Sequence, residues 1–189
     1  AQSLASHATD AGTRCTANAD PQLPVNYGTV NIANYLNRGE KWLSASICQT
    51  ATHEDFLAAG LGFGEAIRAS NSRVVLIASG SLSHRFYPMK ELDQHESSDP
   101  DHVITPEARS ADEQRIRWWE HGDHAAVVES MDDFMRHRPE GLFGHYLMMI
   151  AAIGGAQCTA VGRRFSEYEN AIGTGQVHMW FDQPATGWI

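Results

Sequence analysis

The chain has 189 residues, of which 42% are apolar and 20% are charged, and its formal net charge is -9 at pH 7. These proportions are typical of a globular domain that buries a core. The acidic balance argues against a nucleic acid or an anionic membrane as a partner, and no apolar stretch is as long as a membrane span. The three cysteines, Cys15, Cys48 and Cys158, form no Cys-x-x-Cys pair. Reduced thiols in the cytoplasm are therefore expected.

The hydrophobic pattern predicts helices and strands that alternate along the chain. Helices are expected over residues 1–14, 28–36, 54–69, 105–121, 123–136 and 145–153, and strands over 42–48, 74–78 and 177–181. The polar stretch 88–106 is expected to be a long loop or lid. This alternation predicts one α/β domain portion over residues 1–189, with a central mixed sheet flanked by helices.

The segment Ala78-Ser-Gly-Ser-Leu-Ser-His-Arg-Phe86 is the strongest functional signal. It follows the apolar run at 74–78, which has the pattern of a buried strand, so His84 lies in a tight loop at the strand's carboxyl end. Ligands of open α/β sheets bind at such strand ends. From the residues alone, proton transfer or metal binding by His84 and a hydrogen-bonding role within the turn are about equally favoured.

A second cluster, Phe165-Ser-Glu-Tyr-Glu-Asn-Ala-Ile-Gly-Thr-Gly-Gln-Val177, places two carboxylates just before a Gly-Thr-Gly turn. Glu167 and Glu169 are both candidate metal ligands, although solvated surface carboxylates are more frequent. The glycine pattern Gly60-Leu-Gly-Phe-Gly64 lies inside a predicted helix and is discounted as a dinucleotide fingerprint.

Three motifs, Asn26-Tyr-Gly-Thr29, Ser81-Leu-Ser-His84 and Gly173-Thr-Gly-Gln-Val177, occur in the order found in the class III extradiol ring-cleaving dioxygenases. The chain resembles this family, the protocatechuate 4,5-dioxygenase catalytic-subunit superfamily, from about Leu23 to Trp180. The resemblance implies an extradiol dioxygenase fold and a non-haem iron(II) centre, for which Mn(II) is an accepted substitute. It also implies a catecholic or aminophenolic substrate that reacts with O2.

The same resemblance assigns roles to individual residues. It makes His84 the acid/base beside the metal and a substrate-binding residue, and it makes Glu167, rather than Glu169, the metal-ligating glutamate. Tyr27 is expected to line the substrate pocket, and His145 to have a structural or supporting role.

In this family the two metal-binding histidines lie in an N-terminal portion, and the chain begins in what corresponds to the middle of the family's sequence. We therefore expect the C-terminal part of such an enzyme, acting as a homo-oligomer or in a complex with the segment that carries the two histidines. The alternative is a non-catalytic partner subunit of a heteromeric enzyme such as 2-aminophenol 1,6-dioxygenase.

Overall fold

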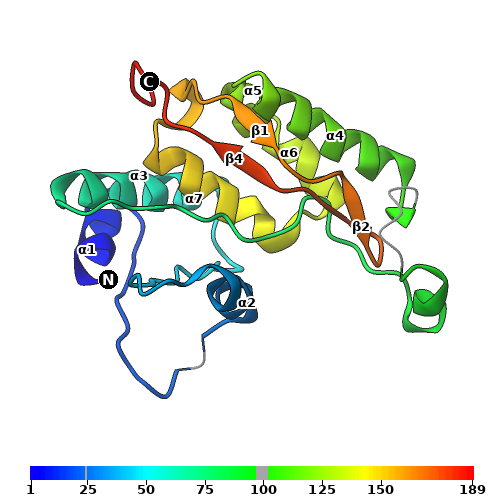
Figure 1. The fold of residues 1–189 in the computed structure, drawn as a ribbon, viewed down its shortest axis with the longest axis horizontal. Helices are drawn as coiled ribbons and strands as arrows, with labels where there is room; N and C mark the ends of the chain where they lie inside the picture. Colours follow the sequence, from blue (N-terminus) through cyan, green and yellow to red (C-terminus); the bar gives the residue numbers. More distant parts are fainter. Residues whose placement is uncertain (24, 97–101) are drawn as a thin grey trace. The chain divides into compact units, whose positions relative to one another are not determined.

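The computed structural model describes residues 1–23, 25–96 and 102–189 (Figure 1). Helices and short strands are both present, which confirms the mixed class of α and β structure. The chain forms two compact units. Unit 1 comprises residues 1–80 and 144–152, and unit 2 comprises residues 81–143 and 153–189.

Unit 1 is organised around helix α3 (His53–Ala69), which packs against α1 (Gln2–Asp10) and α7 (Gly144–Ala152). A reciprocal capping box starts α3. The Asp55 N–H donates to the Thr52 hydroxyl, and the Thr52 N–H donates to the Asp55 carboxylate at 2.8 Å. Two backbone donors that a helix start leaves without partners are thereby satisfied.

The glycines of α3 allow its neighbours to approach closely. A Cβ at Gly60 would lie 2.3 Å from the Met148 carbonyl oxygen of α7, and a Cβ at Gly62 would lie 2.5 Å from the Ala8 Cα of α1. Gly64 meets the α7 backbone as Gly60 does. The glycine pattern is therefore a helix-packing device, in agreement with its rejection as a nucleotide-binding motif.

Unit 2 contains the helices α4 (Pro106–Glu120), α5 (His124–Glu129) and α6 (Met131–Phe134). Its core includes the buried rings of Trp119, Phe134 and Phe143, of which Phe134 and Phe143 meet edge to face at 5.1 Å. The Arg115 guanidinium lies 3.9 Å from the centre of the Phe134 ring. Such a contact stabilises a partly desolvated cation.

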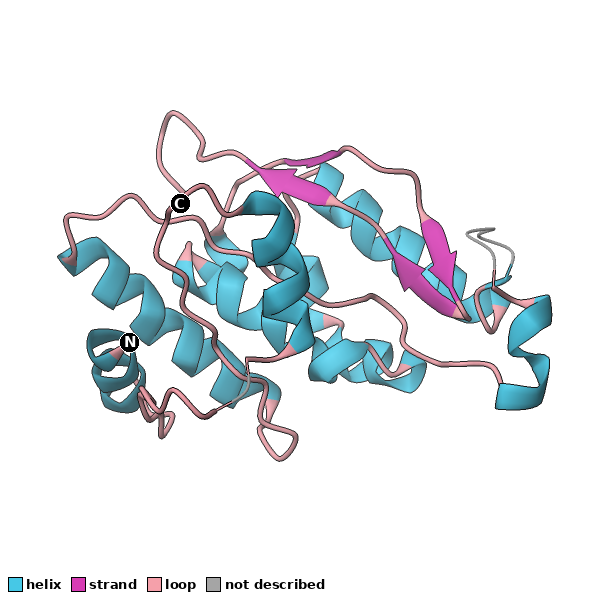
Figure 2. Cartoon of the chain, turned by 60° about the horizontal axis from the view of Figure 1, so that its bottom comes forward, coloured by secondary structure: helices cyan, strands magenta, loops and turns pink. Residues whose placement is uncertain are grey.

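The strands of unit 2 form two separate antiparallel pairs (Figure 2). Strand β1 (Gly162–Arg164) pairs with β4 (Met179–Phe181), and β2 (Glu169–Ala171) pairs with β3 (Thr174–Gln176). The expected central mixed sheet is not seen among the described residues. The strand expected over 177–181 is confirmed at β4, with a later start.

The prediction of strands over residues 42–48 and 74–78 is wrong. Neither segment has strand pairing within the described part of the chain. Val74, Val75 and Ile77 are 45%, 66% and 43% exposed, so the apolar run is not buried. A strand needs a neighbour to accept its backbone hydrogen bonds, and local apolar character does not supply one.

The predicted helices agree better with the structure, although one of them is divided. The helix expected over 123–136 is split into α5, α6 and a short 3₁₀ turn, with the break at Ser130. The Arg115 guanidinium donates to the Ser130 hydroxyl at 3.0 Å at this break. The stretch expected as a loop over 88–106 contains a 3₁₀ helix, Met89–Gln94, and its residues 97–101 lie outside the described residues.

Helix α2 (Tyr27–Leu36) confirms the helix expected over 28–36, and none of its residues is buried. Across the described ranges, no helix combines the length and the apolar character needed to cross a bilayer.

We expect Gly60→Ala to lower the free energy of unfolding by about 1–3 kcal/mol, because its methyl group would overlap the α7 backbone. Helix propensity alone would change stability in the opposite direction by up to about 1 kcal/mol. Urea denaturation measures the difference. The control is Glu65→Ala on the exposed side of α3, which should change stability by less than about 0.5 kcal/mol. A stabilising effect of Gly60→Ala would contradict the close packing of α3 and α7.

Candidate active site

The loop Ser81–His84 is fixed by its backbone. Ser81, Leu82 and Ser83 are buried, and His84 is half-buried. The His84 N–H donates to the carbonyls of His137 and Arg138 at 3.2 and 3.0 Å. The His84 ring meets Phe86 edge to face at 4.7 Å, and its Nδ1 has no hydrogen-bond partner among the described residues. The backbone is thus held, and one ring nitrogen is buried without a partner among the described residues.

The Gly-Thr-Gly turn packs directly on this loop. The Leu82 N–H donates to the Gly175 carbonyl, and the Gly175 N–H donates to the Ser83 carbonyl, both at 3.0 Å. A Cβ at Gly175 would lie 2.1 Å from an Asp112 carboxylate oxygen and 2.3 Å from the Tyr168 hydroxyl. Position 175 therefore requires glycine, because two buried side chains occupy the space beside its Cα.

The segment on the other side of the loop has a strained backbone. Arg138, Leu142 and Phe143 have φ values of 50°, 56° and 60°. The left-handed conformation costs roughly 1–2 kcal/mol for each residue that is not glycine. Burial of the Phe143 ring, which is 1% exposed, offsets part of this strain. Glu140 also reaches back to the loop, where it accepts a hydrogen bond from the Ser81 N–H at 2.6 Å.

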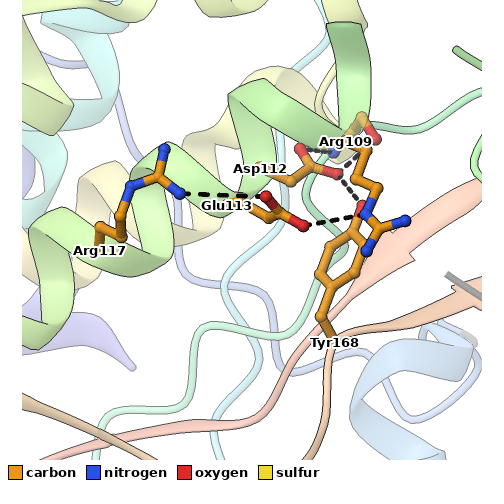
Figure 3. A network of polar contacts seen from close by, with 6 residues as sticks. Arg109, Asp112, Glu113, Arg117 and Tyr168 are labelled. Atoms are coloured by element: carbon orange, nitrogen blue, oxygen red, sulfur yellow. Dashed lines mark hydrogen bonds and ion pairs between the residues drawn. The ribbon is translucent and has the colours of Figure 1, made fainter. Parts of the chain in front are cut away.

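Asp112, on α4, is the fully buried carboxylate beneath the loop (Figure 3). Its Oδ1 accepts from the Ser83 N–H at 2.9 Å. Its Oδ2 accepts from the Ser83 hydroxyl at 2.6 Å and from the Tyr168 hydroxyl at 2.7 Å. Burial raises the pKa of Asp112 to about 6, because the loss of hydration outweighs these three hydrogen bonds and the nearby Arg115 charge.

Asp112 connects the two segments that the sequence singled out. Ser83 directly precedes His84, and Tyr168 directly follows Glu167. One carboxylate therefore binds a chain neighbour of each predicted site residue.

Glu167 and Glu169 are both exposed. Glu169 is the first residue of β2 and pairs with Gln176, whereas Glu167 lies in the loop before that strand. The Ser166 hydroxyl donates to the Glu167 carbonyl and accepts from the His178 N–H. These contacts fix the backbone beside Glu167 and leave its carboxylate directed to solvent.

Tyr27 and His145 belong to unit 1, whereas His84 and Glu167 belong to unit 2. Tyr27 opens α2, and its side chain is 64% exposed. The His145 ring lies against the backbone of Gly80, where an added Cβ would be 2.4 Å from the ring. This contact gives His145 a packing role at the residue that precedes the His84 loop.

Sequence reasoning missed Asp112 and Tyr168. The signal for Asp112 was present, because it lies on the face of α4 that carries the buried residues Ala108, Ile116 and Trp119. A carboxylate on an apolar helix stripe must find hydrogen-bond donors. The next residue, Glu113, contrasts with it, since it forms partly exposed ion pairs with arginines of the same helix (Figure 3).

In the parts of the chain that the structure describes, no three His, Cys, Asp or Glu side chains gather as a metal-binding group. These residues alone do not provide the two imidazoles and one carboxylate of a non-haem iron site.

Comparison with known proteins identifies the family. Residues 1–181 match the family described as "Catalytic LigB subunit of aromatic ring-opening dioxygenase". The chain belongs to this family, which confirms the resemblance found in its motifs. A similar protein is 3,4-dihydroxyphenylacetate 2,3-dioxygenase from Escherichia coli, which is 27% identical over 158 residues, covering 81% of this chain and 55% of that protein. The chain thus spans about half the length of this relative.

We expect the stabilising contribution of Asp112 to depend on pH. Its pKa is raised in the folded state to about 6 from an ordinary value of 3.8, so the contribution is full below the lower value and declines as pH rises through about 6. A pKa difference of about two corresponds to up to about 3 kcal/mol. The unfolding free energy of the wild type minus that of Asp112→Asn should therefore fall between pH 4 and pH 7.5. Glu113→Gln is the control. A constant or rising difference would contradict the assignment.

Proposed function

We propose that this chain is the part of a non-haem iron(II) extradiol dioxygenase that supplies the acid/base and one metal ligand. The substrate is a catechol, 3,4-dihydroxyphenylacetate, and the product is a hydroxymuconic semialdehyde. Family membership and the relative that acts on this catechol support the proposal. The observation that carries it is the common attachment of the His84 loop and the Glu167 segment to Asp112.

The proposed reaction needs no external reductant. The ring C–C bond next to one hydroxyl-bearing carbon breaks, and each carbon of that bond receives one atom of O2. The four electrons that reduce O2 come from the catechol itself. The protein must therefore bind both reactants and move protons, and it need not supply electrons.

His84 is proposed to move those protons. Its backbone is fixed, its ring is half-buried, and one ring nitrogen has no partner among the described residues. Imidazole exchanges protons near neutral pH in both directions, as removal of a catechol proton and its later return require. Tyr27 is proposed to contribute to substrate binding.

Glu167 is proposed as the carboxylate ligand of iron(II), with Mn(II) as an accepted substitute. Two histidines from a segment outside this chain would complete the ligand set, so we propose a complex of the two. The exposed apolar side chains of Val74, Val75 and Ile77 support such a partner, because they offer unit 1 apolar surface for it to cover.

The function is tested by loading the chain anaerobically with iron(II), adding 3,4-dihydroxyphenylacetate and O2, and following the yellow ring-opened product. We expect little turnover from the chain alone and restored turnover when the histidine-bearing segment is added. If the completed complex binds iron and still leaves the catechol intact, the chain is a non-catalytic partner subunit instead. Robust turnover by the chain alone would show that its own histidines complete the site.

We expect Glu167→Ala to abolish stable iron binding by the completed complex, whereas Glu169→Ala should retain it. The two glutamates are both exposed and lie two residues apart, so each variant controls for the other. Metal analysis after gel filtration measures the iron content. Equal occupancy in the two variants would mean that Glu167 is not the ligand.

We expect His84→Phe to slow turnover by roughly 100- to 10,000-fold while iron content stays nearly unchanged, because general acid–base catalysis has this magnitude and acts on the transition state. Steady-state kinetics and metal analysis on the same sample measure both quantities. Loss of iron in proportion to loss of activity would instead make His84 a ligand.

A further inference from the structure

We propose that Asp112 is the positioning residue that sets the separation between the proton carrier and the metal-binding carboxylate. The inference rests on the proposed function for the roles of His84 and Glu167. The contacts that carry it are independent of that function.

The two oxygens of Asp112 have different tasks. Oδ1 accepts the Ser83 N–H at 2.9 Å and so fixes the backbone beside His84. Oδ2 accepts two hydroxyls, those of Ser83 at 2.6 Å and Tyr168 at 2.7 Å. One oxygen atom therefore joins the loop before His84 to the segment after Glu167.

The other contacts around this oxygen leave it little freedom to move. Ser83 is 0% exposed and Tyr168 is 7% exposed, so neither hydroxyl can exchange its partner for bulk water. The Cα of Gly175 occupies the adjacent space. A displacement of Asp112 would leave buried donors unsatisfied on both segments, which is more costly than a lost surface contact.

The chemistry of the carboxylate predicts how substitutions rank. Asparagine can form a hydrogen bond at each of the three positions, with the direction of two reversed: its oxygen can accept the Ser83 N–H, and its NH2 group can donate to the two hydroxyl oxygens. Leucine has the same number of side-chain heavy atoms and can accept none of these bonds. Asp112→Asn should therefore retain the arrangement, and Asp112→Leu should lose it on both segments together.

The first arm of the test needs no metal. NMR of the 189-residue chain follows the amide exchange of Ser83 and Tyr168 and the ring resonances of His84, which are identified by their absence in His84→Phe. In Asp112→Leu we expect both amides to exchange at least about tenfold faster and the His84 resonances to move. Asp112→Asn should stay within about threefold of the wild type, and Glu113→Gln, the next residue on α4, should leave all three signals unchanged.

If Asp112→Leu does not fold, Tyr168→Phe decides the matter, because it removes only the link to the Glu167 segment. Exchange should then rise around Tyr168 and stay unchanged at Ser83. The proposal is overturned if a folded Asp112→Leu chain changes only one of the two segments, or if Tyr168→Phe changes neither.

The second arm uses the iron-loaded complex with 3,4-dihydroxyphenylacetate. Asp112→Leu should lower kcat by about 10- to 100-fold, with KM within about threefold, because misplaced catalytic groups slow the reaction more than they weaken binding. Asp112→Asn should restore most of the rate. An unchanged kcat in Asp112→Leu overturns the proposal. If the wild-type complex cleaves no catechol, the proposed function fails, and the NMR arm still decides whether Asp112 joins the two segments.

Discussion

One buried carboxylate holds together the two segments of unit 2 that carry the candidate site residues His84 and Glu167. Asp112 accepts hydrogen bonds from the loop before His84 and from the residue after Glu167, and it is completely shielded from water. An isolated carboxylate would be strongly disfavoured in such surroundings. The three donors make its burial tolerable, and because they come from two distant segments, satisfying the carboxylate fixes the tertiary structure.

Glycine residues allow the close backbone packing around this carboxylate and elsewhere in the chain. At Gly175 the absence of a side chain lets a strand backbone lie against Asp112 and Tyr168. At Gly60 and Gly64 it lets α3 meet the backbone of α7. In both places the backbone lies closer to its neighbour than any Cβ would allow. The close contact, and not a local conformational preference, therefore requires glycine at these positions.

The sequence predicted the helices well because their signals are local. Thr52 and Asp55 mark the start of α3, and the apolar spacing after them defines its buried face. The strands were harder, because Val74–Ala78 has the apolar character of a strand and still lacks a partner among the described residues. His84 and Glu167 were predicted as site residues through motifs that resemble a known family, and they remain predictions. Asp112 was missed because its only local mark is a charge on a buried helix face, whereas its donors lie 29 and 56 residues away.

The exposed run around Val75 has a consequence for the behaviour of the chain in solution. β-branched and apolar residues with no neighbouring strand are a template for pairing with other chains. Charge repulsion from a net charge of -9 opposes such association at low ionic strength, and added salt screens that repulsion. The isolated chain should therefore be handled in dilute, low-salt buffer, where it is most easily kept monodisperse.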